Sequence, residues 1–185
     1  MKRILGVVGS PRKKGNTHIL VARILDGAKA EGAAAEMLFL NDLDIRACDG
    51  CHVCWQGKPC GKRDDMNEIY PKIAESDAMV FGTPVYWYGP TALMKGFIDR
   101  FVYFNCPENR EKIRGKPAAI AVPFEEPHPE TADLLIAFFE KSLHYLEMDL
   151  VGKILVPGVT RRGEIREKRQ SLEAGYELGR RLAGA

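Results

Sequence analysis

Short apolar runs alternate with longer amphipathic stretches along the whole sequence, and this alternation restricts the fold more than any other feature. Five runs have the length and composition of buried β-strands: RILGVVG (3–9), AEMLFL (35–40), DAMVFGTPV (77–85), KPAAIAVPF (116–124) and LVGKILVPG (150–158). The stretches between and after them have helical spacing, at about 16–31, 65–76, 90–104, 129–147 and 163–182. Strands that alternate with helices pair in parallel through right-handed crossovers.

The alternation therefore predicts a doubly wound α/β protein with helices on both faces of a five-stranded parallel sheet. Such a sheet commonly has the flavodoxin-like strand order 2-1-3-4-5, in which the ligand lies beyond the carboxyl ends of the strands at the switch point. The functional loops should then follow the first, third and fourth strands. With 45% hydrophobic and 28% charged residues, the chain has enough apolar material for one core, so we expect a single domain over residues 1–185.

The sequence carries neither a strong net charge nor a long apolar segment. Its 27 Lys and Arg residues nearly balance 25 Asp and Glu, which leaves a formal net charge of +2 and no broad field to attract nucleic acid or an acidic membrane. The first apolar run breaks at GSPRKKGN (9–16), and nowhere do roughly 18 apolar residues follow one another, so we expect a soluble, cytoplasmic protein. Thiols stay reduced in that compartment, where clustered cysteines more often mark a metal or redox site than a disulfide framework.

The loop after the first run, within GVVGSPRKKGNT (6–17), predicts a seat for a phosphate group. Ser10, Asn16 and Thr17 supply side-chain donors near a helix start, where unpaired backbone N–H groups already favour an anion. Arg12 adds a full positive charge. The loop has neither the Gly-Lys-Ser/Thr ending of a Walker sequence nor the G-x-G-x-x-G pattern of dinucleotide sites, which favours the terminal phosphate of a mononucleotide. An ordinary strand-to-helix turn capped by Asn16 is the alternative.

Three consecutive aromatic residues follow the third run. Pro84 ends the strand because it has no N–H to donate, and Pro90 suits the first turn of the next helix. Between them, Tyr86, Trp87 and Tyr88 can form a flat, partly apolar wall for a planar ring, whose polar edge would bond to backbone N–H groups. Exposed aromatic residues suit a contact between subunits equally well.

Four of the five cysteines lie within the loop 47–63, between the second strand and the following helix. Their spacing is Cys48-x2-Cys51-x2-Cys54-x5-Cys60. The tight spacing of the first three suits a loop wrapped around one corner of a [4Fe-4S] cluster. Zinc sites more often take two cysteine pairs from separate stretches, and idle thiols or a disulfide are further alternatives. We expect His52, inside the run, to face solvent and the isolated Cys106 to be a spare thiol.

The two loops and the cysteines occur in an order that resembles a known family. GSPRKKGNT (9–17) followed by PVYWYGPTALMKGFIDR (84–100) is similar to the NADPH-dependent FMN reductase superfamily, and the intervening cysteine run resembles its iron–sulfur flavoprotein branch. The resemblance implies FMN as cofactor, with its phosphate at Ser10, Arg12, Asn16 and Thr17 and its isoalloxazine beside Pro84, Val85, Tyr86 and Trp87. After the fourth strand, proteins of this family usually have a glycine-rich loop, whereas the chain has AVPFEEPHPE (121–130). This difference weakens the expectation of a bound nicotinamide phosphate.

Together these features predict an FMN-containing iron–sulfur flavoprotein that transfers electrons between one-electron and two-electron partners. No side chain is assigned a catalytic role, since the chemistry would lie on the flavin and the sequence shows no convincing Ser-His-Asp or Cys-His arrangement. A cluster-free NAD(P)H-dependent FMN or quinone reductase and a flavin-free binding module are the alternatives. We expect a redox partner such as ferredoxin or NAD(P)H and a homodimer or homotetramer, but neither nucleic acid nor a membrane.

Overall fold

The five apolar runs form one parallel sheet in the order β2-β1-β3-β4-β5, as the alternation predicts. The computed structural model describes residues 1–184. Its strands are β1 (Arg3–Val8), β2 (Ala34–Phe39), β3 (Ala78–Gly82), β4 (Pro117–Pro123) and β5 (Asp149–Val156). The switch in strand order falls between β1 and β3, so the loops that follow these two strands leave the sheet side by side.

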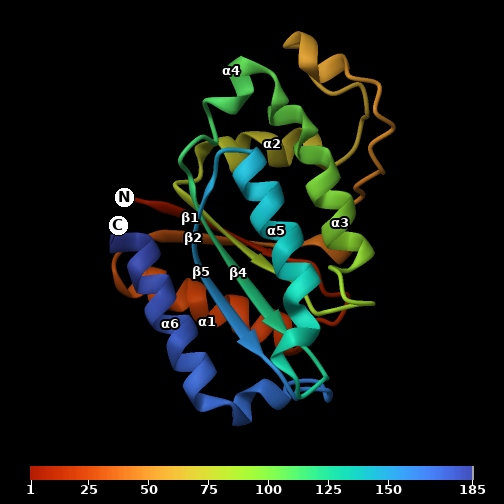
Figure 1. Cartoon of the computed structure of the whole chain (residues 1–185). Helices are drawn as coiled ribbons and strands as arrows, with labels where there is room; N and C mark the ends of the chain where they lie inside the picture. The colour runs from red at the N-terminus through yellow and green to blue at the C-terminus, as the bar shows by residue number, and fades with distance from the viewer. Residues whose placement is uncertain (185) are drawn as a thin grey trace.

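Helices cover both faces of the sheet, so that the molecule has three layers (Figure 1). The helices are α1 (Asn16–Ala30), α2 (Met66–Glu75), α3 (Ala92–Asp99), α4 (Pro107–Arg110), α5 (Asp133–Tyr145) and α6 (Arg169–Gly184). Short 3-10 segments accompany them: η1 (Leu40–Asp42), η2 (Val53–Gln56), η3 (Arg100–Asn105), η4 (Pro129–Ala132) and η5 (Glu164–Glu167). α1 and α6 lie together on one face, and α2, α3 and α5 lie on the other (Figure 1). The flavodoxin-like architecture predicted from the sequence is confirmed.

Both faces of the sheet are apolar because residues along each central strand alternate between two cores. In β3, Met79 and Phe81 pack in the core under α2, α3 and α5. Ala78 and Val80, on the opposite face, pack in the core under α1 and α6. A strand that is buried on both sides has a continuous apolar sequence, which explains the composition of the predicted strands.

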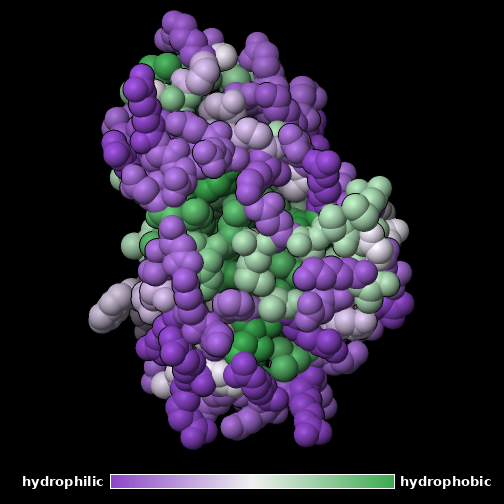
Figure 2. Space-filling view, turned by 180° about the vertical axis from the view of Figure 1, so that it is seen from behind, coloured by the Kyte–Doolittle hydropathy of each residue, from purple (hydrophilic) through white to green (hydrophobic). Residues whose placement is uncertain are grey.

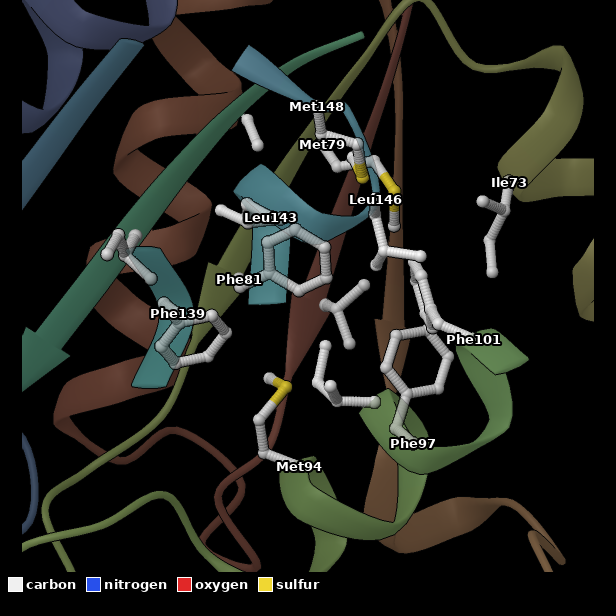
Figure 3. Packing of buried hydrophobic residues seen from close by; sticks show 14 of the residues in the cluster. Ile73, Met79, Phe81, Met94, Phe97, Phe101, Phe139, Leu143, Leu146 and Met148 are labelled. Carbon is white, nitrogen blue, oxygen red and sulfur yellow. The ribbon is translucent and has the colours of Figure 1, made fainter. Parts of the chain in front are cut away.

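Aromatic rings fill the core between the sheet and helices α3 and α5 (Figure 3). The ring centroids of Phe97 and Phe101 lie 5.2 Å apart, and those of Phe81 and Phe139 lie 5.8 Å apart. All four rings are buried, and burying a side chain of this size contributes about 1.5–3 kcal/mol relative to leaving it exposed. This core fixes α3 to the sheet.

α1 and α6 approach each other closely because a glycine lies at the contact on each helix. A Cβ at Gly27 would lie 2.0 Å from the Tyr176 carbonyl oxygen, and a Cβ at Gly179 would lie 1.8 Å from the Ile24 carbonyl oxygen. Both distances are far shorter than a non-bonded contact, so a larger residue would push the helices apart. The close packing also brings the segment between β5 and α6 against the beginning of α1.

Two helices end or begin differently from the sequence prediction. The stretch predicted as one helix over 90–104 contains α3 and most of the 3-10 segment η3, and the short helix α4 follows as a separate element. Cys106, which precedes Pro107, is extended (φ −75°, ψ 148°), as residues before proline usually are, so helical geometry cannot run on into α4. The stretch 163–182 starts as η5 and becomes α6 only after Lys168, whose ψ of 63° lies outside the helical region.

The face opposite the view of Figure 1 is mostly hydrophilic, with a hydrophobic area near its middle (Figure 2). The edge strand β2 has a neighbour on one side only, and most of its residues are partly exposed. Within residues 1–184, no helix has both the length and the hydropathy of a membrane span.

Candidate functional site

A hollow of about 110 Å³ opens at the carboxyl ends of the strands, where this architecture places its ligands. Four loops line this first hollow: those after β1, β3, β4 and β5. Its lining includes all the predicted cofactor-binding residues except Trp87: Ser10, Arg12, Asn16, Thr17, Pro84, Val85 and Tyr86. The fold thus brings together two predicted loops that are far apart in the sequence.

The beginning of α1 forms one end of the first hollow. Its N-cap residue is Gly15, which has no side chain to cap the helix, and the first turn of this fully described helix carries no acidic residue. The N–H groups of the turn and the positive end of the helix dipole are therefore available to an anion. Glycine is needed at the cap, because a Cβ there would lie 2.8 Å from the Arg12 carbonyl oxygen, which accepts the Gly15 N–H.

The side chains around this helix start have different surroundings. Ser10 and Thr17 are buried, and the Ser10 hydroxyl accepts a hydrogen bond from the Arg12 N–H at 3.3 Å. Arg12 is exposed, and its guanidinium donates to the Thr160 carbonyl oxygen at 3.4 Å. The Asn16 amide bonds to three backbone groups of the segment after β5, so its side chain is already occupied.

The segment after β5 is part of the site, although the sequence does not predict it. Val159, Thr160 and Arg162 line the first hollow beside the loop after β1. In the sequence they lie in or beside the basic stretch TRRGEIREKRQ (160–170), whose simplest interpretation is a solvated helix start. The signal that could have found them is the rule that all strands of a parallel sheet end at the same edge, which applies to the fifth strand as well.

The aromatic residues after β3 form a tight turn that projects from the sheet. Tyr86 and Gly89 exchange backbone hydrogen bonds of 2.8 and 3.0 Å. Trp87 and Tyr88, between them, have left-handed φ angles of 48° and 62°, an uncommon backbone for bulky residues. The turn leaves Trp87 96% exposed, and Figure 1 shows the yellow-green loop after β3 standing out from the body of the molecule.

Trp87 lines a second hollow of about 230 Å³. The two hollows share Val85, Phe124 and Glu125, so they are neighbouring parts of one site. The first contains the start of α1 and suits an anionic group, whereas the second has aromatic walls and suits a planar ring. Glu125 and Glu126, from the acidic loop after β4, also line the second hollow.

Helix α3 starts directly behind these loops. Its N-cap residue Thr91 accepts a hydrogen bond from the Met94 N–H and donates its hydroxyl to the Gly9 carbonyl oxygen. The Thr91 N–H donates to the Thr83 hydroxyl at 3.2 Å. Thr91 therefore joins the loop after β1 to the loop after β3. At the far end of the helix that it caps, Arg100 contacts the cysteine loop.

The four clustered cysteines line one small cavity of about 20 Å³ between the loop 47–63 and residues Tyr70, Arg100 and Val102. Cys54 is buried, Cys48 and Cys60 are partly exposed, Cys51 is exposed, and all are free thiols. Burial raises the pKa of the Cys54 thiol, and the neighbouring thiols, Cys60 first, raise it further. No group of three Cys, His, Asp or Glu side chains in residues 1–184 is arranged as a metal site. The loop thus offers the donor set of an iron–sulfur site around one cavity without drawing the sulfurs to ligand positions.

Two residues near the cysteines have other surroundings. His52 is exposed and lines the cavity, and its ring meets the Trp55 indole edge-on at a centroid distance of 3.9 Å. Cys106 is buried beside η3, with its sulfur 4.0 Å from the Tyr103 carbonyl oxygen. Its thiol lies in a different segment from the other four, as the sequence suggests.

A buried ion pair fixes both ends of the cysteine loop. The Arg100 guanidinium, directly after α3, binds both carboxylate oxygens of Asp64, and the two side chains are 1% and 0% exposed. The same guanidinium donates to the Arg46 carbonyl oxygen at 2.8 Å and to the Cys60 sulfur at 3.4 Å. Burial alone would raise the pKa of Asp64, but hydrogen bonds from Arg100 and from the Arg46 N–H lower it overall. The carboxylate stays charged, and a positive group lies beside one of the four thiols.

Comparison with known proteins identifies the family to which this arrangement belongs. The sequence profile of the family described as NADPH-dependent FMN reductase matches residues 2–138, which is most of the chain. The chain belongs to this family. The match to the NADPH-dependent FMN reductase family includes the loops after β1, β3 and β4 and the cysteine loop, whereas the segment after β5 lies outside it.

Two curated relatives are similar to this chain in sequence, and one solved structure is similar to it in fold. An iron–sulfur flavoprotein of Methanocaldococcus jannaschii is 38% identical over 98 residues, 53% of this chain and 51% of that protein. The chain spans about half the length of the iron–sulfur flavoproteins that it matches. YwqN of Bacillus subtilis, named as an NAD(P)H-dependent FMN-containing oxidoreductase, is 29% identical over 184 residues, 97% of each chain. The Trp repressor binding protein of Bacillus subtilis has a TM-score of 0.73 at 24% identity, covers 95% of this chain and 96% of its own, and supports the fold.

Proposed function

We propose that the chain binds FMN in the two hollows at the strand ends and acts as a flavin-dependent oxidoreductase. The observation that carries the proposal is that two distant loops, both predicted to bind the cofactor, line one hollow at an α-helix start whose N–H groups are available. The description of the matched family and the names of the relatives support FMN as the ligand.

The first hollow would hold the phosphate of FMN. The N–H groups at the start of α1 would bind its oxygens, and Arg12 would supply a positive charge. Ser10 and Thr17 would add hydroxyl groups, whereas Asn16 would contribute its backbone N–H, because its side chain is occupied. The isoalloxazine would lie beside the residues that follow β3: Pro84, Val85, Tyr86 and Trp87.

The cysteine loop would hold a [4Fe-4S] cluster through four thiolates. The fit is in the donor set: Cys48, Cys51, Cys54 and Cys60 line one cavity. Arg100 adds a hydrogen bond and a positive charge at the Cys60 sulfur, which favours a group of thiolates there. FMN when bound can exchange one or two electrons and a cluster exchanges one, so the two groups together would connect one-electron and two-electron partners. The protein would hold FMN and the cluster toward opposite ends of α3, which has eight residues and is about 12 Å long.

The electron partner would be a redox protein such as ferredoxin, or NAD(P)H. Glu125 and Glu126 line the second hollow, beside which a nicotinamide nucleotide would have to lie. Carboxylates at this position disfavour the phosphates of NAD(P)H by like-charge repulsion, so the loop after β4 favours a protein partner.

The exposure of Trp87 favours an assembly of several copies. A flavin ring bound beside Trp87, on surface loops of one small domain, would keep one face in water unless a second copy covered it. We therefore expect that the chain, as a single domain, forms a homodimer or homotetramer. Size-exclusion chromatography with light scattering distinguishes these assemblies from a monomer.

A cluster-free NAD(P)H-dependent FMN or quinone reductase is the second candidate function. It is favoured by the arrangement of the four thiols, which form no metal site within the described residues 1–184. The similarity to YwqN, which extends over 97% of the chain, also favours it.

Anaerobic purification followed by flavin and iron analysis tests both candidates. About one FMN with about four iron and four sulfide per chain supports the iron–sulfur flavoprotein. FMN with negligible iron leaves the cluster-free reductase. Protein that gains no flavin absorbance on mixing with FMN would contradict both and leave a flavin-free binding module.

A further inference from the structure

The segment after β5 lies across the start of α1 and is held there by three hydrogen bonds of the Asn16 side chain, with a fourth from Arg12 to the Thr160 carbonyl oxygen. We name residues 159–165 the strap. The Asn16 amide nitrogen donates to the Val159 and Arg161 carbonyl oxygens at 3.4 and 3.1 Å. The Asn16 amide oxygen accepts from the Ile165 N–H at 3.2 Å. One side chain of the first loop therefore holds both ends and the middle of the strap.

The strap also has its own internal brace, which separates two neighbouring arginines. The Glu164 carboxylate accepts hydrogen bonds from the N–H groups of Thr160 and Arg161 at 2.6 and 2.7 Å. The Arg161 guanidinium turns to the same carboxylate, with contacts of 3.2 and 3.1 Å. Arg162, the next residue, lines the first hollow instead. Two adjacent side chains of equal charge thus have different surroundings.

More positive than negative side chains face the first hollow. Arg12 and Arg162 are the cationic side chains of its lining, and they add to the positive end of α1. Glu125, also in the lining, is the opposing carboxylate. The balance favours an anion with more than one negative charge, such as the dianionic phosphate monoester of a flavin mononucleotide.

We infer that Arg162 is a second cationic ligand of the phosphate group. Asn16 is the positioning residue, because its bonds to the strap hold Arg162 at the first hollow. The inference rests on the proposed FMN site and goes beyond it, because the strap lies outside residues 2–138, which match the family. In this arrangement the phosphate lies between two arginines from opposite ends of the chain. The strap then adds to the preference of the site for FMN over riboflavin, which has the same ring but no phosphate.

The test compares Arg162→Ala with Arg161→Ala, a matched control that removes the same charge one residue away. Flavin-free protein is titrated with FMN and with riboflavin, and binding is followed by quenching of flavin fluorescence. We expect Arg162→Ala to weaken FMN about tenfold or more and leave riboflavin unchanged, while Arg161→Ala changes FMN binding less than about threefold. Equal weakening in both variants, or equal weakening of FMN and riboflavin by Arg162→Ala, would overturn the inference. Tight FMN binding that Arg162→Ala does not alter sinks this inference alone, whereas wild-type protein that binds no FMN sinks the proposed function as well.

A double-mutant cycle tests the role of Asn16. If Asn16 acts through the strap, Arg162→Ala should cost less than about threefold in an Asn16→Ala background, against about tenfold or more in the wild type. A full cost in both backgrounds would show that Asn16 does not position Arg162. Riboflavin binding by Asn16→Ala is the control for an intact ring site, and its loss would likewise contradict a role confined to the strap.

Discussion

The hollows at the strand ends and the cysteine loop are held in place by different forces. Four loops form the hollows, and all four start at the same edge of a sheet whose two faces are buried. The polar side chains of these loops bond mainly to backbone groups of neighbouring loops. The cysteine loop lies beside η3, away from the strand ends, and its two ends meet at the buried pair of Arg100 and Asp64. Arg100 and Lys116 are both buried, and each accepts or donates a hydrogen bond with a residue of α2, Tyr70 for Arg100 and Ile73 for Lys116.

This difference indicates how separable the two sites are. The positions of the strand-end loops follow from the order of the strands, so a local change there should alter ligand binding and little else. Cys54 is the one buried residue of the cysteine loop, all of which the structure describes, so the position of the loop depends largely on the buried pair of Arg100 and Asp64. Removing one partner of such a pair strongly destabilises a protein. The helix α3 connects the two, since Thr91 at its start bonds to Gly9 and Arg100 follows its end.

Substitution of a cysteine should give the largest and most selective effect. Cys51 is the exposed member of the four, so Cys51→Ser should leave the fold intact while removing one ligand of the proposed cluster. We expect loss of the brown iron–sulfur absorbance and of bound iron, with FMN retained. Cys106→Ser is the matched control and should keep both chromophores. Loss of flavin together with iron in Cys51→Ser would show that the two sites are not separable.

Breaking the buried ion pair should give the largest loss of stability. Asp64→Asn keeps the shape of the side chain but leaves the Arg100 charge buried without its counter-charge, which should cost about 3–5 kcal/mol in the free energy of unfolding. Urea denaturation measures this cost. The control is Glu140→Gln, which breaks an exposed pair with Lys153 and should cost less than about 1 kcal/mol. Similar costs for the two variants would mean that burial of the charges does not hold the cysteine loop.

Removal of the proposed phosphate ligand Arg12 should act on binding and not on stability. Arg12 is exposed, so Arg12→Ala should weaken FMN binding by about 1.5–3 kcal/mol, the size of a charge-assisted hydrogen bond, with little change in urea midpoint. Lys13→Ala removes a neighbouring charge that pairs with Asp42 and should leave FMN affinity nearly unchanged. Isothermal titration calorimetry separates the two variants, and an unchanged FMN affinity in Arg12→Ala would remove Arg12 from the site.

The strand-end site could be predicted to a large extent because its signals are local. Buried parallel strands have continuous apolar sequences, and the strand order then assigns the loops after β1 and β3 to one edge. Ser10 and Tyr86 follow from this reasoning and line the same hollow. The sequence also predicts that Trp87 lies beside a planar ring, but not that the left-handed backbone of its turn goes with a second, neighbouring hollow that Trp87 lines.

The supports of the cysteine loop and the strap could not be predicted, because they depend on contacts between distant residues. Arg100 has the sequence appearance of an ordinary charge at a helix end, yet it bonds to Arg46, Cys60 and Asp64. Arg162 belongs to a basic stretch that suggests a solvated helix, and only the fold shows that it lines the first hollow. Sequence patterns predict which loops meet at the edge of the sheet, but not which charged side chain lies against which loop.

The smallest expected effect concerns Lys116, which is buried at the C-terminal end of α2. Its ammonium donates to the Ile73, Ala74 and Ser76 carbonyl oxygens at the end of the helix that follows the cysteine loop. Burial lowers the pKa of Lys116 to about 8 from an ordinary value of 10.5, and the carboxylate of Asp77 only partly opposes this change. Between pH 8 and 10.5 the unfolded chain then keeps a proton that the folded chain has lost.

The free energy of unfolding should therefore rise with pH over this interval, by about 1–3 kcal/mol, because the unfolded state binds more protons. Lys116→Met removes the titrating group, so its stability should lack this rise, and the difference between the two curves isolates Lys116 from the titration of cysteines and tyrosines. Lys153→Met, at an exposed lysine, is the control and should retain the wild-type rise. Urea denaturation at intervals across this pH range measures all three curves. A wild-type stability that falls relative to Lys116→Met would mean that the three carbonyl oxygens outweigh desolvation and hold the ammonium charged, and the α2 side would then depend on Lys116 as it does on Arg100.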